Sequence, residues 1–462
     1  MPDVADCRRL LCLLFLGPCL LAGCSLVPDY QAPELPASNA WSAVNTEQSQ
    51  PVAGGPWWRE FADSELEQLI QRGLQGNNDL AAAVARVAQA QGNAEMAGSG
   101  RYPQVALDGL FQRRDNYSTS AKRSLSLGAS YEIDFWGRQR ALGDAAAAEA
   151  EASLLDAQTV RMTLAASIAD SYFQVLSLQE RMHLAEAIAA DARQVLQLVQ
   201  VQVGLGAASE LEVAQQRNAL RTFEAAVPNL RQQRDQALYQ LAVLVGATPQ
   251  SFHLQRQRLG EINVPQPTLG VPLDLLTQRP DIQAAEARLH AANFNIGAAR
   301  AAFLPNLSIN LMSGVDTLGS GGVWEVLGNL SQPLFSAGLL QGQLDISRAR
   351  AAELLANYRQ SWITALQDVQ TQISARRELQ DSYALNQQAV EAARQAVQLA
   401  QARYRLGASD FQTLLIAERT QYQAEDALLQ VRLQHLQAAV GLFRALGGDF
   451  NLSHDAAKEA SL

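Results

Sequence analysis

The sequence has little of the chemistry that depends on cysteine or on paired histidines. The four cysteines of this 462-residue chain all lie near its start, at Cys7, Cys12, Cys19 and Cys24. The five histidines are scattered, at His183, His253, His290, His435 and His454. None of them has a second ligand at a spacing typical of a metal site. A mature chain that begins at Cys24 would have no disulfide and no free thiol, so we expect no enzyme, no metal and no other cofactor.

The sequence also lacks a long apolar run and an excess of positive charge. After residue 24 no stretch approaches the roughly 20 apolar residues of a transmembrane helix, so any membrane-crossing segment would have to be strands closed into a barrel. The net charge of -10 argues against nucleic-acid binding. A hydrophobic content of 48% with 18% charged residues is ample for a folded core.

The N-terminus has the pattern of a secretory signal. Arg8 and Arg9 precede the apolar run 10–20, which is too short to span a bilayer, and Ala22-Gly23 precede Cys24. Such a small pair is typical of a bacterial lipobox, so we predict that Cys24 is acylated and becomes the new N-terminus. The alternative is a plain secretory signal with a chance cysteine.

The rest of the chain is a duplicated unit. Residues 79–86 match residues 281–288, and residues 205–211 match residues 406–411 with one residue inserted. Each unit predicts a helix, two strands, one very long helix, a tight turn and a returning helix. The predicted segments are a signal peptide (1–23), an extended lead and equatorial segment (24–62), a first repeat (63–248), a connector (249–272), a second repeat (273–448) and a C-terminal tail (449–462).

Each repeat contains two predicted strands of about ten residues, near 103–136 and 305–335. Apolar residues alternate with polar ones, which favours strands with one apolar and one polar face. Transmembrane strands and soluble hairpins packed on helices would both show this alternation. Because a transmembrane barrel needs about eight strands, the membrane interpretation requires several copies of the chain. Three copies would supply twelve strands and leave room for a passage.

Two segments predict very long helices. From about residue 138 to 203 apolar residues recur every seven positions, and the spacing returns from Leu355 to Tyr404. Sustained heptads of this kind indicate helices packed side by side as in a coiled coil. At 1.5 Å per residue, about 66 residues extend roughly 100 Å.

Both long helices are followed by a turn of similar chemistry. Gly206 and Gly407 can adopt the left-handed conformation that ends a helix. Ser209-Glu210-Leu211-Glu212 and Ser409-Asp410-Phe411-Gln412 then each fit the capping box of a new helix. We interpret these polar residues as caps first and as possible partner contacts second.

Several motifs give the chain a resemblance to a known family. They are the lipobox followed by Val27-Pro28-Asp29-Tyr30, the Trp57-Trp58 pair before Phe61, the tetrapeptide Arg279-Pro280-Asp281-Ile282, and the duplicated helix-strand-strand-helix plan. Over essentially the whole mature chain, their order resembles that of the outer-membrane factors of resistance-nodulation-division efflux systems, the TolC-like family.

The resemblance implies an α+β, mainly helical fold. It implies a homotrimer with a twelve-stranded outer-membrane β-barrel, a periplasmic α-helical coiled-coil barrel and an equatorial belt. It also implies a channel that passively conducts drugs or other small toxic compounds out of the cell. The helical tips would then meet a periplasmic adaptor (membrane fusion) protein and an inner-membrane resistance-nodulation-division pump.

One tip departs from the family pattern. The family often carries an acidic residue in a Leu-Leu-Asp-Ala run, where it forms a ring that narrows the pore. Here the run reads Leu414-Leu415-Ile416-Ala417, with Gln412 and Thr413 one turn earlier. We therefore predict an apolar gate at Gln412, Thr413 and Ile416 that closes by dewetting. The alternative is that Ile416 is buried between helices.

Two other functions stay open at the level of sequence. A related duct could serve an ABC-type protein secretion system. Alternatively, the chain could be a coiled-coil lipoprotein scaffold without a pore.

Overall fold

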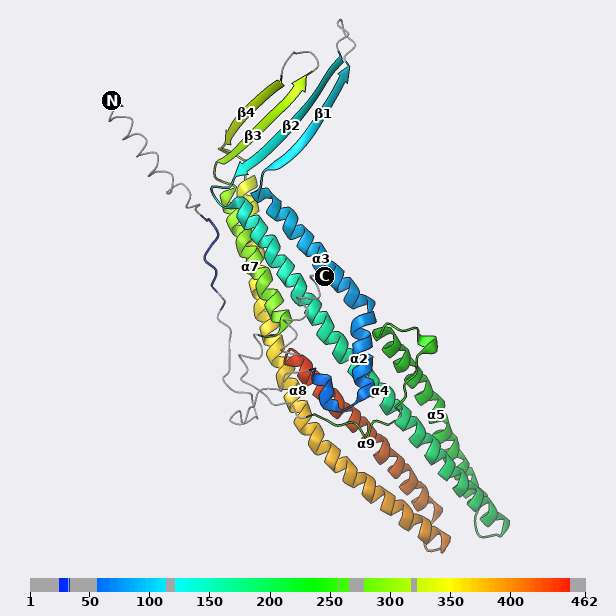
Figure 1. Ribbon diagram of the computed structural model, residues 1–462. Coiled ribbons are helices and arrows are strands. Elements are labelled where there is room, and N and C mark those ends of the chain that lie inside the picture. The colour runs from blue at the N-terminus through cyan, green and yellow to red at the C-terminus, as the bar shows by residue number, and fades with distance from the viewer. Residues whose placement is uncertain are drawn as a thin grey trace, which may run out of the picture. The chain divides into compact units, whose positions relative to one another are not determined.

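The computed structural model describes residues 25–31, 33, 56–113, 121–256, 258–265, 278–316 and 322–448 (Figure 1). The predicted signal peptide, the predicted acylation site Cys24 and the predicted tail lie outside these residues. Among the described helices, none is both long enough and apolar enough to cross a membrane.

The chain contains two copies of one structural unit. The first copy consists of α3 (Asn78–Gly98), β1 (Gln104–Arg113), β2 (Ala121–Ile133), α4 (Arg138–Gly204) and α5 (Glu210–Leu244). The second consists of α7 (Pro280–Ala301), β3 (Asn306–Asp316), β4 (Gly322–Ser331), α8 (Leu339–Arg405) and α9 (Phe411–Ala445). The predicted order of elements is confirmed, and α4 and α8 are equally long at 67 residues.

Short elements complete the described chain: η2 (Trp57–Phe61), α2 (Ser64–Gly76), η3 (Ser99–Arg101) and η4 (Pro249–Ser251). One predicted boundary was wrong. The two strands of the second repeat were expected to reach about residue 335, but β4 ends at Ser331. Pro333 follows, and proline cannot donate a hydrogen bond to a neighbouring strand.

The chain divides into two compact units. Within the described residues, the sheet unit comprises 25–31, 33, 84–113, 121–157, 281–316 and 322–361, and the tip unit comprises 56–83, 158–256, 258–265, 278–280 and 362–448. The long helices α4 and α8 each continue from one unit into the other. Each unit is described by itself below.

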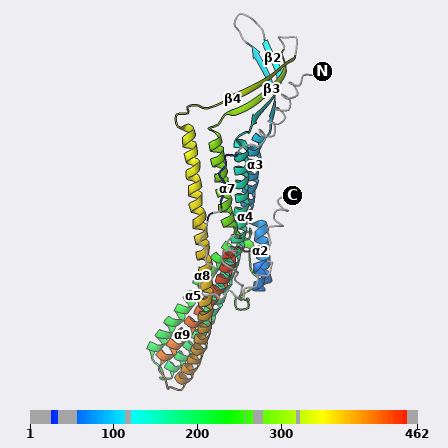
Figure 2. The same ribbon diagram turned by 90° about the vertical axis from the view of Figure 1, so that its left-hand side faces the viewer.

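In the sheet unit, four strands form one antiparallel sheet in the order β1-β2-β3-β4 (Figure 1). Figure 2 shows β2, β3 and β4 in a second view. Residues directly opposite one another share a face, and one such row is Val105, Ala129, Leu311 and Val326. A row on the other face is Glu132, Ser308 and Asn329. The predicted alternation therefore gives the sheet one apolar face and one mainly polar face, on which Leu110, Met312 and Leu327 are also exposed.

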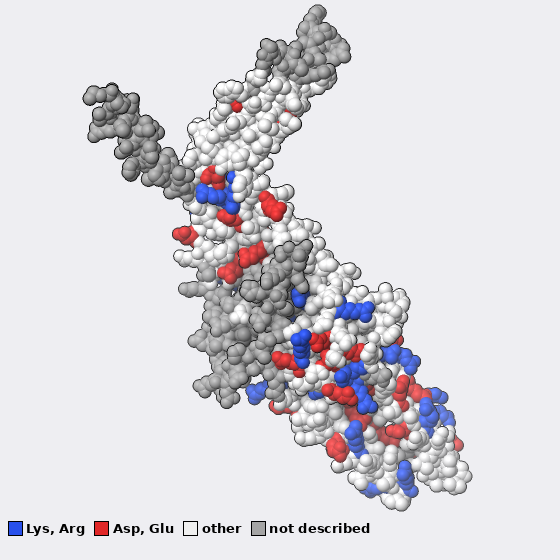
Figure 3. All heavy atoms as spheres, viewed as in Figure 1, with Lys and Arg blue, Asp and Glu red and all other residues white. Residues whose placement is uncertain are grey.

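The apolar face is open to solvent in a single chain. Its exposed large side chains are Val105, Leu107, Phe111, Leu125, Leu127, Leu311, Val315, Trp324, Val326 and Leu330. Figure 3 shows few charged side chains on the sheet and a cluster of acidic and basic side chains next to the helices. Where β2 leads into α4, Arg138 pairs with Glu132 at 2.7 Å. Asp134 caps α4 by accepting hydrogen bonds from the backbone N–H groups of Gln139 and Arg140.

The described segment 25–31 lies along α7. The residues of α7 that contact it share one side of the helix: Glu286, His290, Asn293, Gly297 and Arg300. The Tyr30 and His290 rings have centroids 3.7 Å apart, and the Asn293 amide donates to the Pro28 carbonyl at 2.7 Å. These contacts hold the start of the described chain against the helix.

In the tip unit, the largest core joins η2 and α2 to α4, α5 and α9. Trp57 stacks on Phe443 of α9, with ring centroids 5.4 Å apart. Asp63 caps α2 and is almost fully buried, where it accepts a hydrogen bond from Tyr172 and pairs with Arg256 at 2.9 Å. This pair fastens the chain after α5 to the core.

Gly297→Leu should release the segment 25–31 from α7. A Cβ at Gly297 would lie 2.8 Å from Val27 Cα, and because this is backbone, no flexible side chain can yield. We expect a cost of about 1–3 kcal/mol for such overpacking. Hydrogen-exchange mass spectrometry should show faster exchange of residues 27–31. Gly92→Leu is the matched control, since nothing lies within 4 Å of its Cβ position. Equal protection in both variants would contradict the contact.

Candidate functional site at the helical tips

Each long helix ends in the same hydrogen-bonded turn. At the first tip, Ala207 N–H donates to Gln202 O at 2.8 Å and Gly206 N–H to Val203 O at 2.9 Å. At the second, Ala408 N–H donates to Arg403 O and Gly407 N–H to Tyr404 O. These are the two bonds of a Schellman motif. Gly206 has φ 72° and Gly407 has φ 67°, so both adopt the left-handed conformation that the sequence predicts.

The helix caps after the two turns differ from the prediction at one tip. At the first tip, the Ser209 N–H donates to Glu212 Oε2 at 3.0 Å, as expected for a capping box. At the second, Asp410 is the N-cap, and it accepts hydrogen bonds from the Thr413 N–H at 2.8 Å and hydroxyl at 2.5 Å. These bonds lower the pKa of the Asp410 carboxyl.

The predicted capping box Ser409–Gln412 was therefore wrong. In both turns the cap is the third residue after the left-handed glycine, which is Ser209 after Gly206 and Asp410 after Gly407. Both turns have the same length, so the one-residue insertion expected from the match of 205–211 with 406–411 was wrong. Ser409 is half-buried inside its turn, whereas Asp410 is exposed.

Exposed leucines also mark the tips, and the sequence analysis missed them. Leu205 and Leu406 precede the two left-handed glycines and are 78% and 84% exposed. Leu211 in the first turn of α5 is exposed as well, next to Glu210. The repeated Leu-Gly pair was the available signal. Each tip therefore combines apolar and acidic groups on its surface.

The two helical hairpins, α4/α5 and α8/α9, pack together above the tips. We call this contact the joint. A small core there consists of Val195, Val199, Val213, Ala400, Tyr404, Phe411 and Leu414. The Tyr404 hydroxyl donates to Gln202 Oε1 at 2.8 Å, which links α8 to α4. Burial and the nearby Glu212 charge raise the pKa of Tyr404, so its hydroxyl keeps the proton it donates.

Further from the tips, charged and aromatic pairs continue the joint. Arg181 of α4 makes two hydrogen bonds to Asp426 of α9, at 2.6 and 3.1 Å. A bidentate pair of this kind fixes direction as well as distance. Phe223 of α5 packs edge-on against Tyr422 of α9, with ring centroids 5.6 Å apart. The joint is thus a continuous contact between the two hairpins.

The candidate gate residues lie on the exposed side of α9. Gln412, Thr413 and Ile416 are exposed, whereas Phe411 and Leu414 face the joint. Ile416 is 50% exposed, so the helices of one chain do not bury it. The alternative of burial within the chain is therefore wrong for the single copy.

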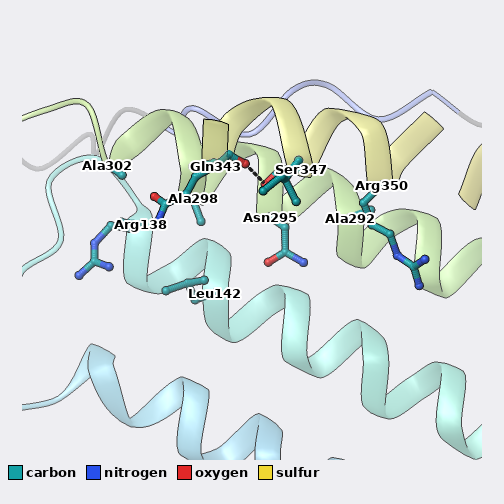
Figure 4. Close-up of a pocket in the computed structure, with 11 residues that line it drawn as sticks. Arg138, Leu142, Ala292, Asn295, Ala298, Ala302, Gln343, Ser347 and Arg350 are labelled. Carbon is teal, nitrogen blue, oxygen red and sulfur yellow. Dashed lines mark hydrogen bonds between the residues drawn. The ribbon is translucent and has the colours of Figure 1, made fainter. Parts of the chain in front are cut away.

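A groove in the sheet unit offers less chemistry than the tips. It has a volume of about 400 Å³ and is lined by α4, α7 and α8 (Figure 4). Its two arginines are already paired, Arg138 with Glu132 and Arg350 with Glu353. In the part of the chain that the structure describes, no group of three His, Cys, Asp or Glu side chains could hold a metal ion.

Comparison with known proteins gives one consistent result. A family model described as "Outer membrane efflux protein" matches residues 69–247 and 271–448. The pyoverdine export outer membrane protein OpmQ of Pseudomonas putida is 38% identical, covering 95% of this chain and 97% of its own. The antibiotic efflux pump outer membrane protein ArpC of Pseudomonas putida is 32% identical, covering 93% of each chain. The open-state crystal structure of the Neisseria gonorrhoeae MtrE outer membrane channel matches with a TM-score of 0.84 at 27% identity, covering 92% of this chain and 99% of that one.

Tyr404→Phe should loosen the joint, because it removes the hydrogen bond to Gln202 and leaves the packing intact. Loss of one such bond weakens a contact by about 1 kcal/mol, roughly a fivefold shift in population. Electron-spin distance measurement between labels at Leu205→Cys and Leu406→Cys should show more widely separated tips. Tyr239→Phe, at an exposed tyrosine of α5, should leave the distances unchanged. Identical distances in Tyr404→Phe and the parent would show that this bond does not hold the joint.

Proposed function

The chain belongs to the outer membrane efflux protein family and is an outer-membrane channel of a tripartite efflux pump, and we propose that it works as a homotrimer that passively conducts small organic molecules. The observation that carries this proposal is the open sheet with one apolar face.

A single copy of the sheet is unsuited to lipid. Within the described residues, β1 and β4 are the edges of the sheet, and edge strands carry unpaired backbone donors and acceptors. In a bilayer every such group must be paired, so a spanning sheet must close on itself. Pairing β1 of one copy with β4 of the next would close it. Three copies would form a barrel of twelve strands, with the apolar face toward lipid and the polar face lining the passage.

The segment 25–31 supports a lipid anchor beside the same sheet. Arg300, one residue before the end of α7, donates to the Leu26 carbonyl at 3.3 Å. The strand β3 begins at Asn306, only a few residues further along the chain. Acyl chains on Cys24 would therefore enter the membrane close to the barrel wall. The anchor and the barrel together would keep the protein in the membrane, since one acyl chain alone binds a membrane weakly.

The tips suit contact with the periplasmic adaptor of the pump. We propose that the exposed leucines Leu205 and Leu406 form the apolar part of this contact. The polar tip residues would surround them: Gly206, Ser209, Glu210, Gly407, Ser409 and Asp410. An apolar centre with a polar rim is the usual composition of a protein interface.

The cargo is proposed from the printed roles of the relatives. One exports pyoverdine and another is part of an antibiotic efflux pump. Both names refer to small organic molecules, which favours that class over secreted proteins. The similarity to a solved channel likewise favours a duct over a scaffold without a pore.

The gate is proposed to be apolar. Ile416 is half exposed on the side of α9 that faces away from the joint, with Gln412 and Thr413 one turn before it. In a trimer, three such faces would surround the axis, and apolar side chains in a narrow pore exclude water. Separation of the hairpins would then widen and wet the opening.

Leu127→Arg should abolish membrane assembly, whereas Ser126→Arg should not. These neighbours on β2 project to opposite faces of the sheet, so the first charge would meet lipid and the second the passage. An arginine on a lipid face costs about 2–4 kcal/mol near the middle of the bilayer. Fractionation should find Leu127→Arg outside the membrane, and it should fail to restore drug resistance to a deletion strain. Normal assembly and resistance with Leu127→Arg would refute the membrane-spanning sheet.

Ile416→Ser should raise the conductance of the closed channel, because a hydroxyl in the constriction retains water. Single-channel recording in planar bilayers measures this directly. We expect at least a several-fold rise, in line with the loss of about 1–2 kcal/mol of apolar contact. Thr420→Ser, one turn further along α9, serves as the control. A closed state that Ile416→Ser leaves unaltered would rule out the apolar gate.

A further inference from the structure

A buried carboxyl group lies inside the joint, between the two hairpins. Glu418 of α9 is 9% exposed, and its neighbours come from the other three helices. Burial and the Asp191 charge on α4 disfavour the ionised carboxylate, whereas the side-chain amides of Gln401 on α8 and Gln216 on α5 lie beside it and favour the ionised form. Neither carboxylate oxygen reaches hydrogen-bond geometry with a described residue. A buried charge without partners is strongly unfavourable.

Gln216 provides the complementary group. This glutamine is fully buried, and its Nε2 donates to the Ala192 carbonyl of α4 at 2.9 Å, which fixes the orientation of the amide. Its Oε1 atom is buried and has no donor among the described residues. The Gln216 Oε1 atom thus lacks a donor and lies beside a carboxyl group that can carry one. One proton on Glu418 would supply it, because a neutral carboxyl group has an O–H to donate.

Other charged groups around the joint are engaged or exposed. Arg394 pairs with Glu425, and Arg181 pairs with Asp426. Arg193 of α4 pairs with Glu224 of α5. Arg217 and Arg419, the sequence neighbours of Gln216 and Glu418, are exposed. Asp191 is therefore the one charged group shown to act on Glu418, and it disfavours the ionised form.

We propose that Glu418 and Gln216 form a proton-binding site that keeps the two hairpins packed when Glu418 is protonated and lets them separate when it ionises. This inference rests on the proposed channel function, because separation of the hairpins would widen the periplasmic end of the passage. The ligand is the proton itself, and the site connects opening of the tip to periplasmic pH.

The direction of the pH effect follows from burial. Desolvation raises the pKa of Glu418 to about 7 in the packed joint, from 4.5 for the solvated group. The packed joint therefore binds the proton more tightly than separated hairpins would. Its extra stability is fully present below pH 4.5 and is lost as the pH rises through about 7. Opening should be least frequent in acid and should reach a plateau above neutral pH.

The test measures tip separation in the purified full-length protein between pH 4.5 and pH 8. Spin labels at Leu205→Cys and Leu406→Cys report the distance, since both side chains are exposed. We expect the ratio of packed to separated tips to fall by about tenfold or more across this range. In Glu418→Gln the ratio should stay high at every pH, because the amide is neutral and can donate to Gln216 Oε1. Glu378→Gln is the matched control at an exposed glutamate of α8 and should keep the parent profile.

The outcomes separate the proposals. A parent profile that is flat, or that persists in Glu418→Gln, overturns the proton-binding site. Glu418→Met, which is neutral and of similar size, should also lose the pH dependence, and it serves if Glu418→Gln fails to fold. Bilayer conductance is recorded in parallel. A parent protein that shows the pH-dependent distances and no conductance at any pH would contradict the channel function and leave the proton-binding site supported.

Discussion

The sheet is the constraint on which the rest of the structure depends. A single four-stranded sheet with one apolar face and two open edges is stable neither in water nor in lipid. In water the apolar face would be exposed, and in lipid the edge groups of β1 and β4 would lack partners. Assembly of several copies, as proposed, would remove both problems at once and create a polar interior. Membrane insertion, oligomerisation and the passage would then all follow from a single arrangement of backbone and side chains.

The tip unit has the opposite requirement, because the proposed gate would have to open as well as close. The joint meets it with contacts that are individually modest: a small apolar core, the Tyr404–Gln202 hydrogen bond and the Arg181–Asp426 pair. Each lies between the same two hairpins, so their effects act on one motion. Because such a contact is stabilised by only a few kcal/mol, a partner at the tips or one buried carboxyl group can shift the equilibrium between packed and separated hairpins.

Much of this architecture could be predicted from the sequence because it is periodic. The heptads predicted the long helices, the apolar–polar alternation predicted the two faces of the sheet, and the internal repeat predicted the order of elements. Local competition decided what was missed: Pro333 ends β4, and the left-handed glycine rather than the Ser409 motif sets the cap at Asp410. The contacts of Glu418 could not be predicted, because its neighbours come from three other helices and only packing brings them together.

The most direct test of the central claim is the mass of the assembled protein without its acyl chains. A variant with Cys24→Ser, exported by a general secretory signal and extracted from outer membranes, should have three times the mass of one chain. It should also stay in the membrane fraction until detergent is added. A monomer that remains in the aqueous fraction would contradict the closed barrel and, with it, the channel.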